Sequence, residues 1–443
     1  MSHQEKLDRL AQQLRSAAGT APVGLAKDTS NLFRDRKPAP KQRLDVRAFD
    51  EVIAIDAEQR WVEVEGMTPY VRLVDAMLEH GLMPAVVPQL KSITIGGAAA
   101  GVGIEASAFR YGLVHETLQE IEVLLPDGRI VIATPDNEHR DLFHGFPNSY
   151  GTLGYALKLK ALAVPVRSFV RVDHTRFSAP AAFFDALEAA CGGDADFVDG
   201  VVFGPDDFVL SQARFVEVAP YTSDYTYEKI YYKSLRARAT DYLTTRDYIW
   251  RWDTDWFWCS KNLGAQNPLV RRLLGRERLN SVFYTRMMRW NSRWGLTGRI
   301  DSLLGRHRES VIQDVDIPLE NAAAFLEFLQ REIGILPVWT CPVRPYRPDA
   351  RFTLFPMRDQ LYVNFGFWDV VRRKHPFAPG HHNRLIEARV VELGGIKSLY
   401  SDSYFDEASF WRLYGGTAYL VLKDRYDPQG RARNLYQKCV LKQ

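Results

Sequence analysis

The sequence predicts an α+β protein of more than one domain, because 443 residues exceed the usual size of a single compact core. The segment EVLLPDGRIVIA places Asp127 and Gly128 between two apolar runs, which is a strong signal of a β-hairpin. The earlier segment YVRLVDAMLEHG has helical spacing and reaches Gly81 where a C-terminal cap is expected. Antiparallel strands and helices are therefore mixed between Val52 and about Pro165.

A second set of elements follows residue 170. The segments AAFFDALEAACGG and HHNRLIEARVVELGG have helical spacing, whereas FVDGVVFGPDDFVLSQARFV is typical of strands. VIQDVDIP and LYVNFGFWDV belong to the same part of the chain. These segments predict a second mixed layer of sheet and helix.

Composition excludes several classes of protein. The longest apolar runs are shorter than the roughly 18 residues of a membrane span, and the first residues, MSHQEKLDRLAQQLR, are charged. We therefore expect a soluble protein on the cytosolic side. The four cysteines are far apart, and the pair His381 and His382 has no helical HExxH partner, so we expect no metal site.

The segment from about 230 to 308 is basic and rich in tryptophan. It holds 16 Lys and Arg against 6 Asp and Glu, and it carries six of the ten tryptophans, at 250, 252, 256, 258, 290 and 294. This combination suits an anionic lipid surface, but it is equally typical of a helical region with a tryptophan core and solvated arginines. No nucleic-acid recognition motif accompanies it, and we expect no nucleic-acid partner.

The most informative stretch is ITIGGAAAGVGIEASAFRYG, residues 93 to 112. Its Gly101 to Ala106 segment matches the GxGxxG/A pattern, but a Rossmann unit needs a parallel strand next, and the DG hairpin is antiparallel. Clustered glycines let a backbone approach a pyrophosphate or a flat ring. A tight seam between a strand and a helix is the alternative.

Three blocks in order, TIGGAAAGVGIEASAFRYG, EVLLPDGRIV and DLFHGFPNSYGTLGYALKLKALAVP, resemble the FAD-binding domain of the vanillyl-alcohol oxidase and p-cresol methylhydroxylase family. The resemblance implies a two-subdomain FAD-binding fold with a substrate or cap domain. It also implies that FAD contacts two glycine-rich walls and a loop of hydroxyl and amide donors. These residues are Gly96, Gly97, Gly101 and Gly103, then Gly151, Thr152 and Gly154, and lastly Ser30 and Asn31.

The loop at Ser30 lacks the flavin-linking histidine of many covalent members, so we expect non-covalent FAD, with His115 as the nearest alternative tether. The resemblance is greatest to the delta-24 sterol reductase branch, through VIQDVDIP, LPVWTCPV and LYSDSYFDEASFW. It implies an FAD-binding domain over 1–170, a substrate domain over 171–400 and a C-terminal segment over 401–443 that returns to the flavin domain.

Flavin transfers a hydride, so the protein must manage a proton at a second carbon. Protonation of an isolated C=C bond is feasible mainly where a branch makes the resulting cation tertiary. The chain begins without the hydrophobic anchor of eukaryotic sterol reductases. We therefore expect a methyl- or methylene-branched phospholipid acyl chain as substrate, gaining or losing a C=C bond, with a sterol side chain as the alternative.

The expected proton donor is Glu105, followed by Tyr404 and Asp402. NADPH is a possible electron donor and would have to meet the flavin directly, because the sequence shows no second nucleotide fold. A lipid methyltransferase is a candidate pathway partner, and a peripheral place at the cytosolic membrane face would suit the basic segment. A flavin-free lipid-binding or scaffold protein is the alternative from another class.

Overall fold

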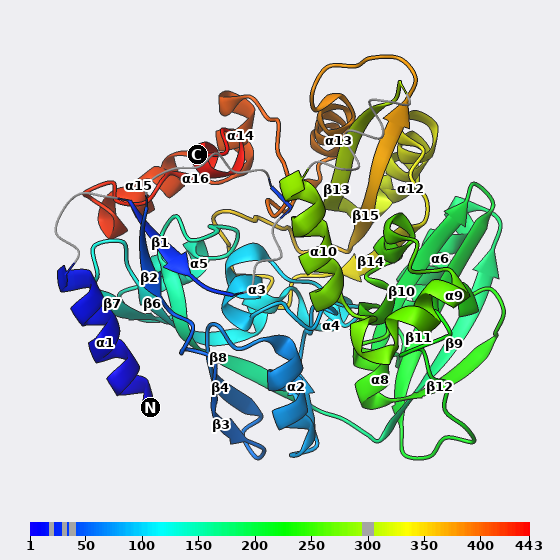
Figure 1. The fold of residues 1–443 in the computed structure, drawn as a ribbon, viewed down its shortest axis with the longest axis horizontal. Helices are drawn as coiled ribbons and strands as arrows, with labels where there is room; N and C mark the ends of the chain where they lie inside the picture. Colours follow the sequence, from blue (N-terminus) through cyan, green and yellow to red (C-terminus); the bar gives the residue numbers. More distant parts are fainter. Residues whose placement is uncertain (17–21, 29–32, 35–40, 295–304) are drawn as a thin grey trace.

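The computed structural model describes residues 1–16, 22–28, 33–34, 41–294 and 305–443. The predicted donors Ser30 and Asn31 lie outside the described residues. Figure 1 shows two main sheets, one on each side of the molecule. The helix α1 (His3–Ser16) and the small parallel pair β1 (Val23–Ala26) and β2 (Gln42–Asp45) lie beside the first sheet.

The first sheet has the strand order β3-β4-β8-β6-β7, and β5 pairs with β8. The strands are β3 (Val52–Asp56), β4 (Trp61–Glu65), β5 (Leu82–Pro84), β6 (Leu118–Leu124), β7 (Ile130–Ala133) and β8 (Tyr155–Pro165). Strands β6 and β7 pair antiparallel around Gly128, whose φ is 97°, so the predicted hairpin is confirmed. All pairings in this sheet are antiparallel, which excludes a Rossmann unit.

Short helices connect these strands. They are α2 (Tyr70–Leu78), α3 (Ile95–Gly101), α4 (Ala108–Tyr111) and α5 (Arg140–Gly145). The predicted helix is α2, and Gly81 follows its end with a φ of 67°. The glycine-rich stretch forms α3, where the Thr94 hydroxyl accepts a hydrogen bond from the Gly97 amide at 3.2 Å.

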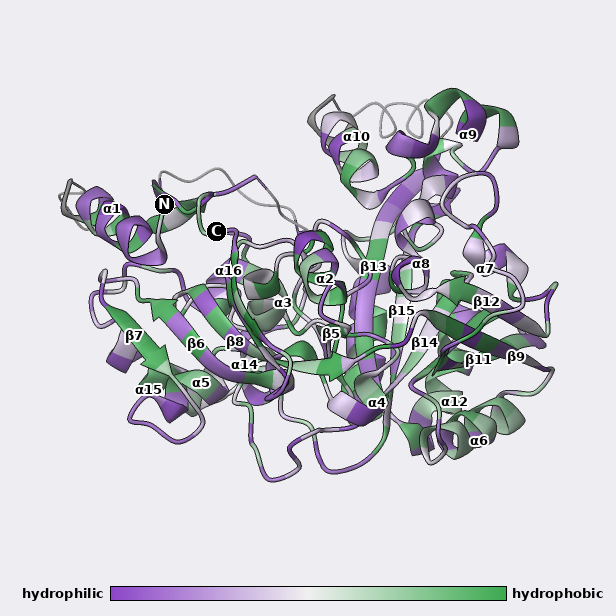
Figure 2. Cartoon of the chain, turned by 90° about the horizontal axis from the view of Figure 1, so that it is seen from below, coloured by the Kyte–Doolittle hydropathy of each residue, from purple (hydrophilic) through white to green (hydrophobic). Residues whose placement is uncertain are grey.

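The second sheet has eight strands in the order β12-β9-β11-β10-β14-β15-β13-β16. Its strands are β9 (Phe169–Phe177), β10 (Phe197–Gly204), β11 (Asp207–Val216), β12 (Thr240–Thr244), β13 (His307–Pro318), β14 (Val338–Val343), β15 (Tyr362–Arg373) and β16 (Ile396–Lys397). Helices α6 (Pro180–Cys191), α12 (Leu319–Phe328) and α13 (His381–Glu392) pack on one face of this sheet. Figure 2 shows α6 and α12 together on that face.

The segment between β11 and β13 holds α7 (Tyr231–Ser234), α8 (Thr245–Ile249), α9 (Pro268–Leu274) and α10 (Ser281–Trp294). Trp250, Trp252, Trp256 and Trp258 are at most 5% exposed, so these four belong to the core. Trp290 is 57% exposed, and the side chain of Trp294 lies outside what the structure describes. The tryptophan cluster therefore serves packing, which is the second of the two interpretations.

The C-terminal helices are α14 (Glu407–Leu413), α15 (Gly416–Tyr426) and α16 (Leu435–Cys439). The Lys423 ammonium donates to the Thr152 carbonyl at 2.8 Å, and Arg425 pairs with Asp141 at 2.7 Å. Both contacts join α15 to the first region, beside which these helices lie in Figure 1. Among the described residues, no helix combines the length and the apolar character needed to cross a membrane.

Candidate active site

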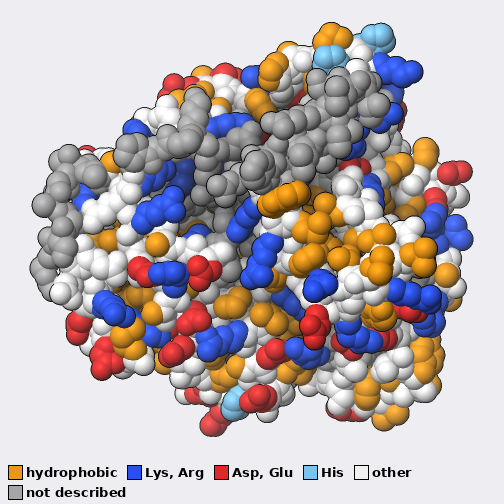
Figure 3. All heavy atoms as spheres, in the orientation of Figure 1, with side chains coloured by type: hydrophobic (Ala, Val, Ile, Leu, Met, Phe, Trp, Pro, Cys, Tyr) orange, Lys and Arg blue, Asp and Glu red, His pale blue; other side chains and the backbone are white. Residues whose placement is uncertain are grey.

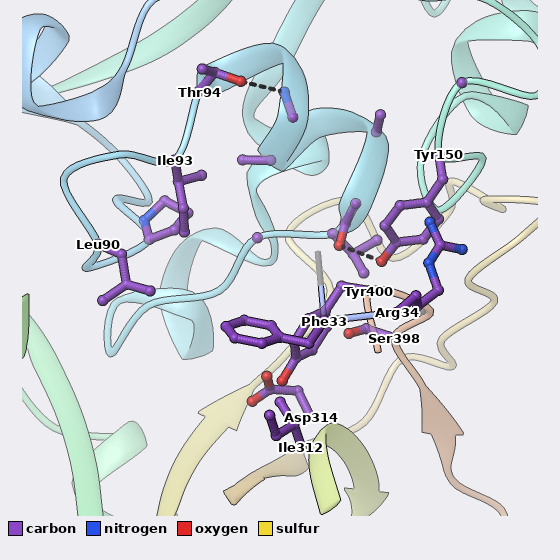
Figure 4. Close-up of a pocket in the computed structure, with 18 of the residues that line it drawn as sticks. Phe33, Arg34, Leu90, Ile93, Thr94, Tyr150, Ile312, Asp314, Ser398 and Tyr400 are labelled. Carbon is purple, nitrogen blue, oxygen red and sulfur yellow. Dashed lines mark hydrogen bonds between the residues drawn. The ribbon is translucent and has the colours of Figure 1, made fainter. Parts of the chain in front are cut away.

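A cavity of about 870 Å³ lies between the two sheets. One wall comes from α3 and the loop before β8, and the opposite wall comes from β13 and β15 of the second sheet. Figure 4 shows Thr94 and Tyr150 on the first side, with Asp314 and Ile312 facing them from the other. Residues more than 200 positions apart in the sequence therefore share one site.

The glycines of the first wall differ in which atoms a Cβ at each position would meet. A Cβ on Gly97 would touch only the Thr94 hydroxyl, at 2.9 Å, and Gly97 is exposed on the cavity wall. A Cβ on Gly96 would stand 2.6 Å from the Gly66 carbonyl oxygen, and one on Gly103 would stand 2.7 Å from Pro88. Only a side-chain hydroxyl stands against a Cβ on Gly97, so its cavity side is open. Close contact with backbone accounts for Gly96, and close contact with side chains accounts for Gly103.

Gly101 lies between these two cases, because a Cβ there would be 3.2 Å from the ring of Tyr150, which is tight but not a severe clash. The Tyr150 hydroxyl also donates a hydrogen bond to the Gly101 carbonyl at 3.2 Å. Gly151 and Gly154 also line the cavity, with φ values of 78° and 146° that favour glycine. The predicted contact Thr152 is fully buried, is not part of the lining, and donates its hydroxyl to the Ser149 carbonyl.

The end of the cavity at the first wall is basic. Lys27, Lys41, Arg43, Arg433 and Lys438 line it, and Arg34 lies 4.7 Å above the Tyr150 ring and donates to the Cys439 thiol. These six cations favour an anionic ligand such as a diphosphate, and Arg289, Arg308 and Arg372 add positive charge elsewhere in the lining of the cavity. This cluster was not predicted from the sequence, because its members come from both ends of the chain.

The second wall follows the alternation of two paired strands. On β13 the lining residues are 308, 310, 312, 314 and 316, and on β15 they include 364, 368, 370 and 372. The odd-numbered Val311, Val315 and Ile317 belong instead to the core under α12 and α13. Since side chains alternate across a sheet, one face stabilises the fold and the other faces the cavity.

Asp314 is the central polar group of this wall. Its side-chain oxygen Oδ1 is buried and has no hydrogen-bond partner in the described structure. The Trp368 indole N–H donates to the Tyr400 hydroxyl at 2.8 Å, and both groups interact with the Asp314 carboxyl. Burial raises the pKa of Asp314 to about 7, against the opposing effect of the Tyr400 and Trp368 hydrogen bonds.

Gly366 is paired with Asp314 across the two strands, and it leaves room for this arrangement. A Cβ there would stand 2.4 Å from the Trp368 ring and 2.9 Å from Asp314 Oδ1. Asp316 lies two residues on and accepts a hydrogen bond from the Asn364 amide at 2.9 Å. Burial raises the pKa of Asp316 to about 7 as well. Two carboxyls that favour the protonated form therefore face one cavity.

Aromatic rings complete the wall around Asp314. Phe257 lies 4.7 Å from Trp368 and 5.5 Å from Trp339 between ring centroids, and all three line the cavity. Such rings offer an apolar surface to a substrate and a negative face to a positive charge. Phe33, from the loop between β1 and β2, packs edge-on against Tyr400 at 5.9 Å.

The structure places the expected proton donor Glu105 elsewhere. Glu105 does not line the cavity; it pairs with the buried Arg251 at 3.3 Å, and Arg251 also pairs with Asp199 at 3.0 Å. Burial raises the pKa of Glu105 to about 7, which Arg251 opposes. This ion cluster joins the loop after α3 to β10, so the geometry favours a structural role for Glu105.

Asp402 and Tyr404 also lie outside the lining of the cavity. Asp402 pairs with Lys442 at 3.1 Å, and the Tyr404 amide donates to Glu387 at 3.0 Å. The same segment reaches the cavity earlier, through Ser398 and Tyr400. The catalytic role of Asp402 and Tyr404 stays a prediction, and the structure brings Tyr400 of the same segment to the cavity instead.

His115, the alternative tether, is buried against Phe352, with ring centroids 4.4 Å apart, and it does not line the cavity. Burial lowers its pKa to about 3, so the imidazole is neutral. No described contact brings His115 to the glycine wall.

Comparison with known proteins agrees with this arrangement. Residues 8–134 match the FAD binding domain family. This part of the chain is similar to FAD binding domains. It is 25% identical to the "Delta(24)-sterol reductase" of Arabidopsis thaliana, over 91% of this chain and 77% of the relative. It is also 25% identical to the Homo sapiens protein of that name, over 88% of this chain and 76% of the relative.

A more limited similarity connects the chain to "Cytokinin dehydrogenase 2" of Oryza sativa subsp. japonica, at 26% identity over 41% of this chain and 32% of the relative. The resemblance to FAD-linked oxidoreductases and their delta-24 sterol reductase branch is thus confirmed. The match at residues 8–134 contains the glycine wall, whereas the sterol reductase similarity extends over the second wall too.

The residues present fit FAD. Gly97 leaves open the space that a Cβ would fill, and the six cations suit a diphosphate at the same end. The carboxyl and aromatic wall lies opposite the glycine wall. When bound and reduced, FAD supplies a hydride to this space.

Proposed function

We propose that this protein is an FAD-dependent oxidoreductase that reduces a C=C bond in the branched side chain of a sterol-class lipid, with FAD held non-covalently. The observation that carries the proposal is the half-buried Asp314 carboxyl, which faces the cavity opposite the glycine wall and whose Oδ1 atom is buried without a hydrogen-bond partner in the described structure. Similarity to sterol reductases over about nine-tenths of the chain supports the substrate class.

This substrate differs from the acyl chain that we expected from the sequence. The preference for an acyl chain depended on the start of the chain and on a tryptophan-rich membrane surface. Four of those tryptophans are core residues, and neither comparison names an acyl substrate. The sterol side chain is therefore the better proposal.

In the proposed reaction, the Asp314 carboxyl donates a proton to one carbon of the C=C bond, and reduced FAD, held at the glycine wall, would supply the hydride for the other carbon. Protonation leaves positive charge on the more substituted carbon, where the Trp339, Trp368 and Phe257 rings stabilise it. Asp314 then recovers a proton from solvent. A pKa near 7 keeps much of the carboxyl protonated at neutral pH.

The decisive experiment uses the purified protein, reduced chemically without air. A sterol with a C24 double bond should reoxidise the flavin and gain two hydrogen atoms, whereas a phospholipid with a methylene-branched acyl chain should not. Turnover of the phospholipid alone would restore the acyl chain as substrate. Protein that binds no FAD, or reduced flavin that neither alkene reoxidises, would overturn the proposed function.

A further inference from the structure

Four large apolar side chains are exposed on two neighbouring helices of the second region. Leu269 and Leu273 on α9 are 67% and 83% exposed, and Met287 and Trp290 on α10 are 36% and 57% exposed. Positions 269 and 273 are four apart, and positions 287 and 290 are three apart, so each pair lies on one side of its helix. Figure 2 shows α9 and α10 projecting from the same face of the molecule. We call these four side chains the apolar tip.

The apolar tip lies among positive charges. From Pro268 to Trp290 the chain has six arginines and one acidic residue, Glu277. Five of the arginines are exposed, at 272, 276, 278, 286 and 289. Figure 3 shows apolar side chains gathered on this face with lysine and arginine side chains around them.

Arg271 differs from these five because it is buried. It is 1% exposed and donates its Nε to the Tyr227 carbonyl at 2.8 Å. Two of the exposed arginines pair with carboxylates of the chain, Arg272 with Glu228 at 3.0 Å and Arg276 with Asp224 at 2.9 Å. Exposed pairs of this kind are weak, so an anionic ligand can compete for these cations.

The same helix that carries part of the apolar tip also lines the cavity. Met288 and Arg289 of α10 belong to the cavity lining, as do Asn262 and Leu263, just before α9. Met287 and Trp290 on the same turn are exposed. Helix α10 therefore lies between the cavity and the surface that bears the apolar tip.

We propose that the apolar tip and its arginines form a docking surface for a membrane with anionic lipids. Leucine, methionine and tryptophan would enter the boundary between headgroups and acyl chains, and the arginines would meet the phosphates. That this surface also delivers the substrate to the cavity rests on the proposed function, but docking itself does not.

The test is flotation of the full-length protein with vesicles of phosphatidylcholine, with and without about one-third phosphatidylglycerol. The wild type should bind the anionic vesicles, and the double variant Leu269→Asp with Leu273→Asp should bind at least about tenfold more weakly. Trp290→Asp should weaken binding in the same way. The matched control is Leu420→Asp with Val421→Asp on α15, whose side chains are 52% and 62% exposed. That variant should bind within about twofold of the wild type.

Charge reversal separates the two parts of the surface. Arg278→Glu with Arg286→Glu should weaken binding to the anionic vesicles about tenfold or more and leave binding to neutral vesicles unchanged. Absence of vesicle binding by the wild type, or an equal loss in the α15 control, would overturn the proposal. Sedimentation tests whether a second copy of the chain covers this surface instead of a membrane. A wild-type dimer that becomes a monomer in the double variant Leu269→Asp with Leu273→Asp would show that it does. Sterol turnover in detergent reports on the proposed function separately.

Discussion

The two walls of the cavity use the chain in different ways. The wall at α3 presents backbone, with Gly97 open to the cavity, and cations gather at its end. The wall at β13 and β15 presents side chains, and Asp314 lies at its centre among aromatic rings. The first wall is suited to holding a large planar cofactor, and the second is suited to proton transfer in an apolar space. Under the proposed function, FAD binding and proton transfer reside on different sheets, so we expect that each can be disrupted separately.

The largest effect is expected at the second wall. Asp314→Asn removes the acidic proton with little change in shape, so reoxidation of reduced FAD by the sterol alkene should slow by roughly 10²- to 10⁴-fold. Binding of FAD should be unaffected, because Asp314 lies on the wall opposite Gly97. Stopped-flow absorbance of the flavin measures the rate, and a titration with FAD measures the affinity.

The rival donor provides a comparison for that result. Glu105→Gln should retain the alkene reaction to a much greater degree, since Glu105 belongs to the cluster of Arg251 and Asp199. If Glu105→Gln lost turnover and Asp314→Asn kept it, the proton donor would be Glu105. Wild-type turnover should also fall as pH rises through about 7, where Asp314 loses its proton.

At the first wall, Gly97→Val should weaken FAD binding by about 100-fold or more while the apoprotein remains folded. The new side chain would project into the cavity, where the nearest protein atom to its Cβ is the Thr94 hydroxyl. Calorimetric titration with FAD and the melting temperature of the apoprotein together give the answer. Unchanged FAD affinity would show that FAD lies elsewhere.

The neighbouring Gly96→Ala should behave in the opposite way. Its Cβ would stand 2.6 Å from the Gly66 carbonyl oxygen, so α3 must move away from the turn that follows β4. The free energy of unfolding of the apoprotein should fall by about 1–3 kcal/mol. Denaturant unfolding without FAD measures the effect, and an unchanged midpoint would contradict the packing role of Gly96.

The smallest effect concerns Asp316. Burial raises its pKa from 3.8 to about 7, so the folded protein binds this proton more tightly than the unfolded chain does. The stability that this carboxyl contributes is present below pH 4 and is lost as pH rises to about 7. Asp316→Asn cannot ionise, so its free energy of unfolding should rise relative to that of the wild type as pH increases from 4 to 7. Unfolding of both proteins at pH 4, 5.5 and 7 tests the trend, and a constant difference would contradict it.

The pattern of neighbouring residues was sufficient to predict those elements whose sequence signals span only a few residues. The DG hairpin, the helix before Gly81, and the glycine-rich segment beside the cavity were all predicted from neighbouring residues. The family resemblance added FAD, because its motifs are also short and ordered along the chain. These features depend on backbone conformation, which nearby residues largely determine.

Only the tertiary structure decided which side chains face the cavity. The VIQDVDIP segment was recognised as part of the family pattern, yet nothing in its sequence showed that Asp314 and Asp316 lie on the cavity face. That assignment depends on pairing with β15 and on the helices that cover the opposite face. The sequence analysis selected Tyr404, whereas the structure brings Tyr400 to the cavity. It also allowed a tryptophan-rich surface, whereas four of the tryptophans are buried. Both differences arise because contacts between distant segments decide burial. Burial and facing are set by contacts between distant segments, so the residues that carry the chemistry are identified only after the sheets come together.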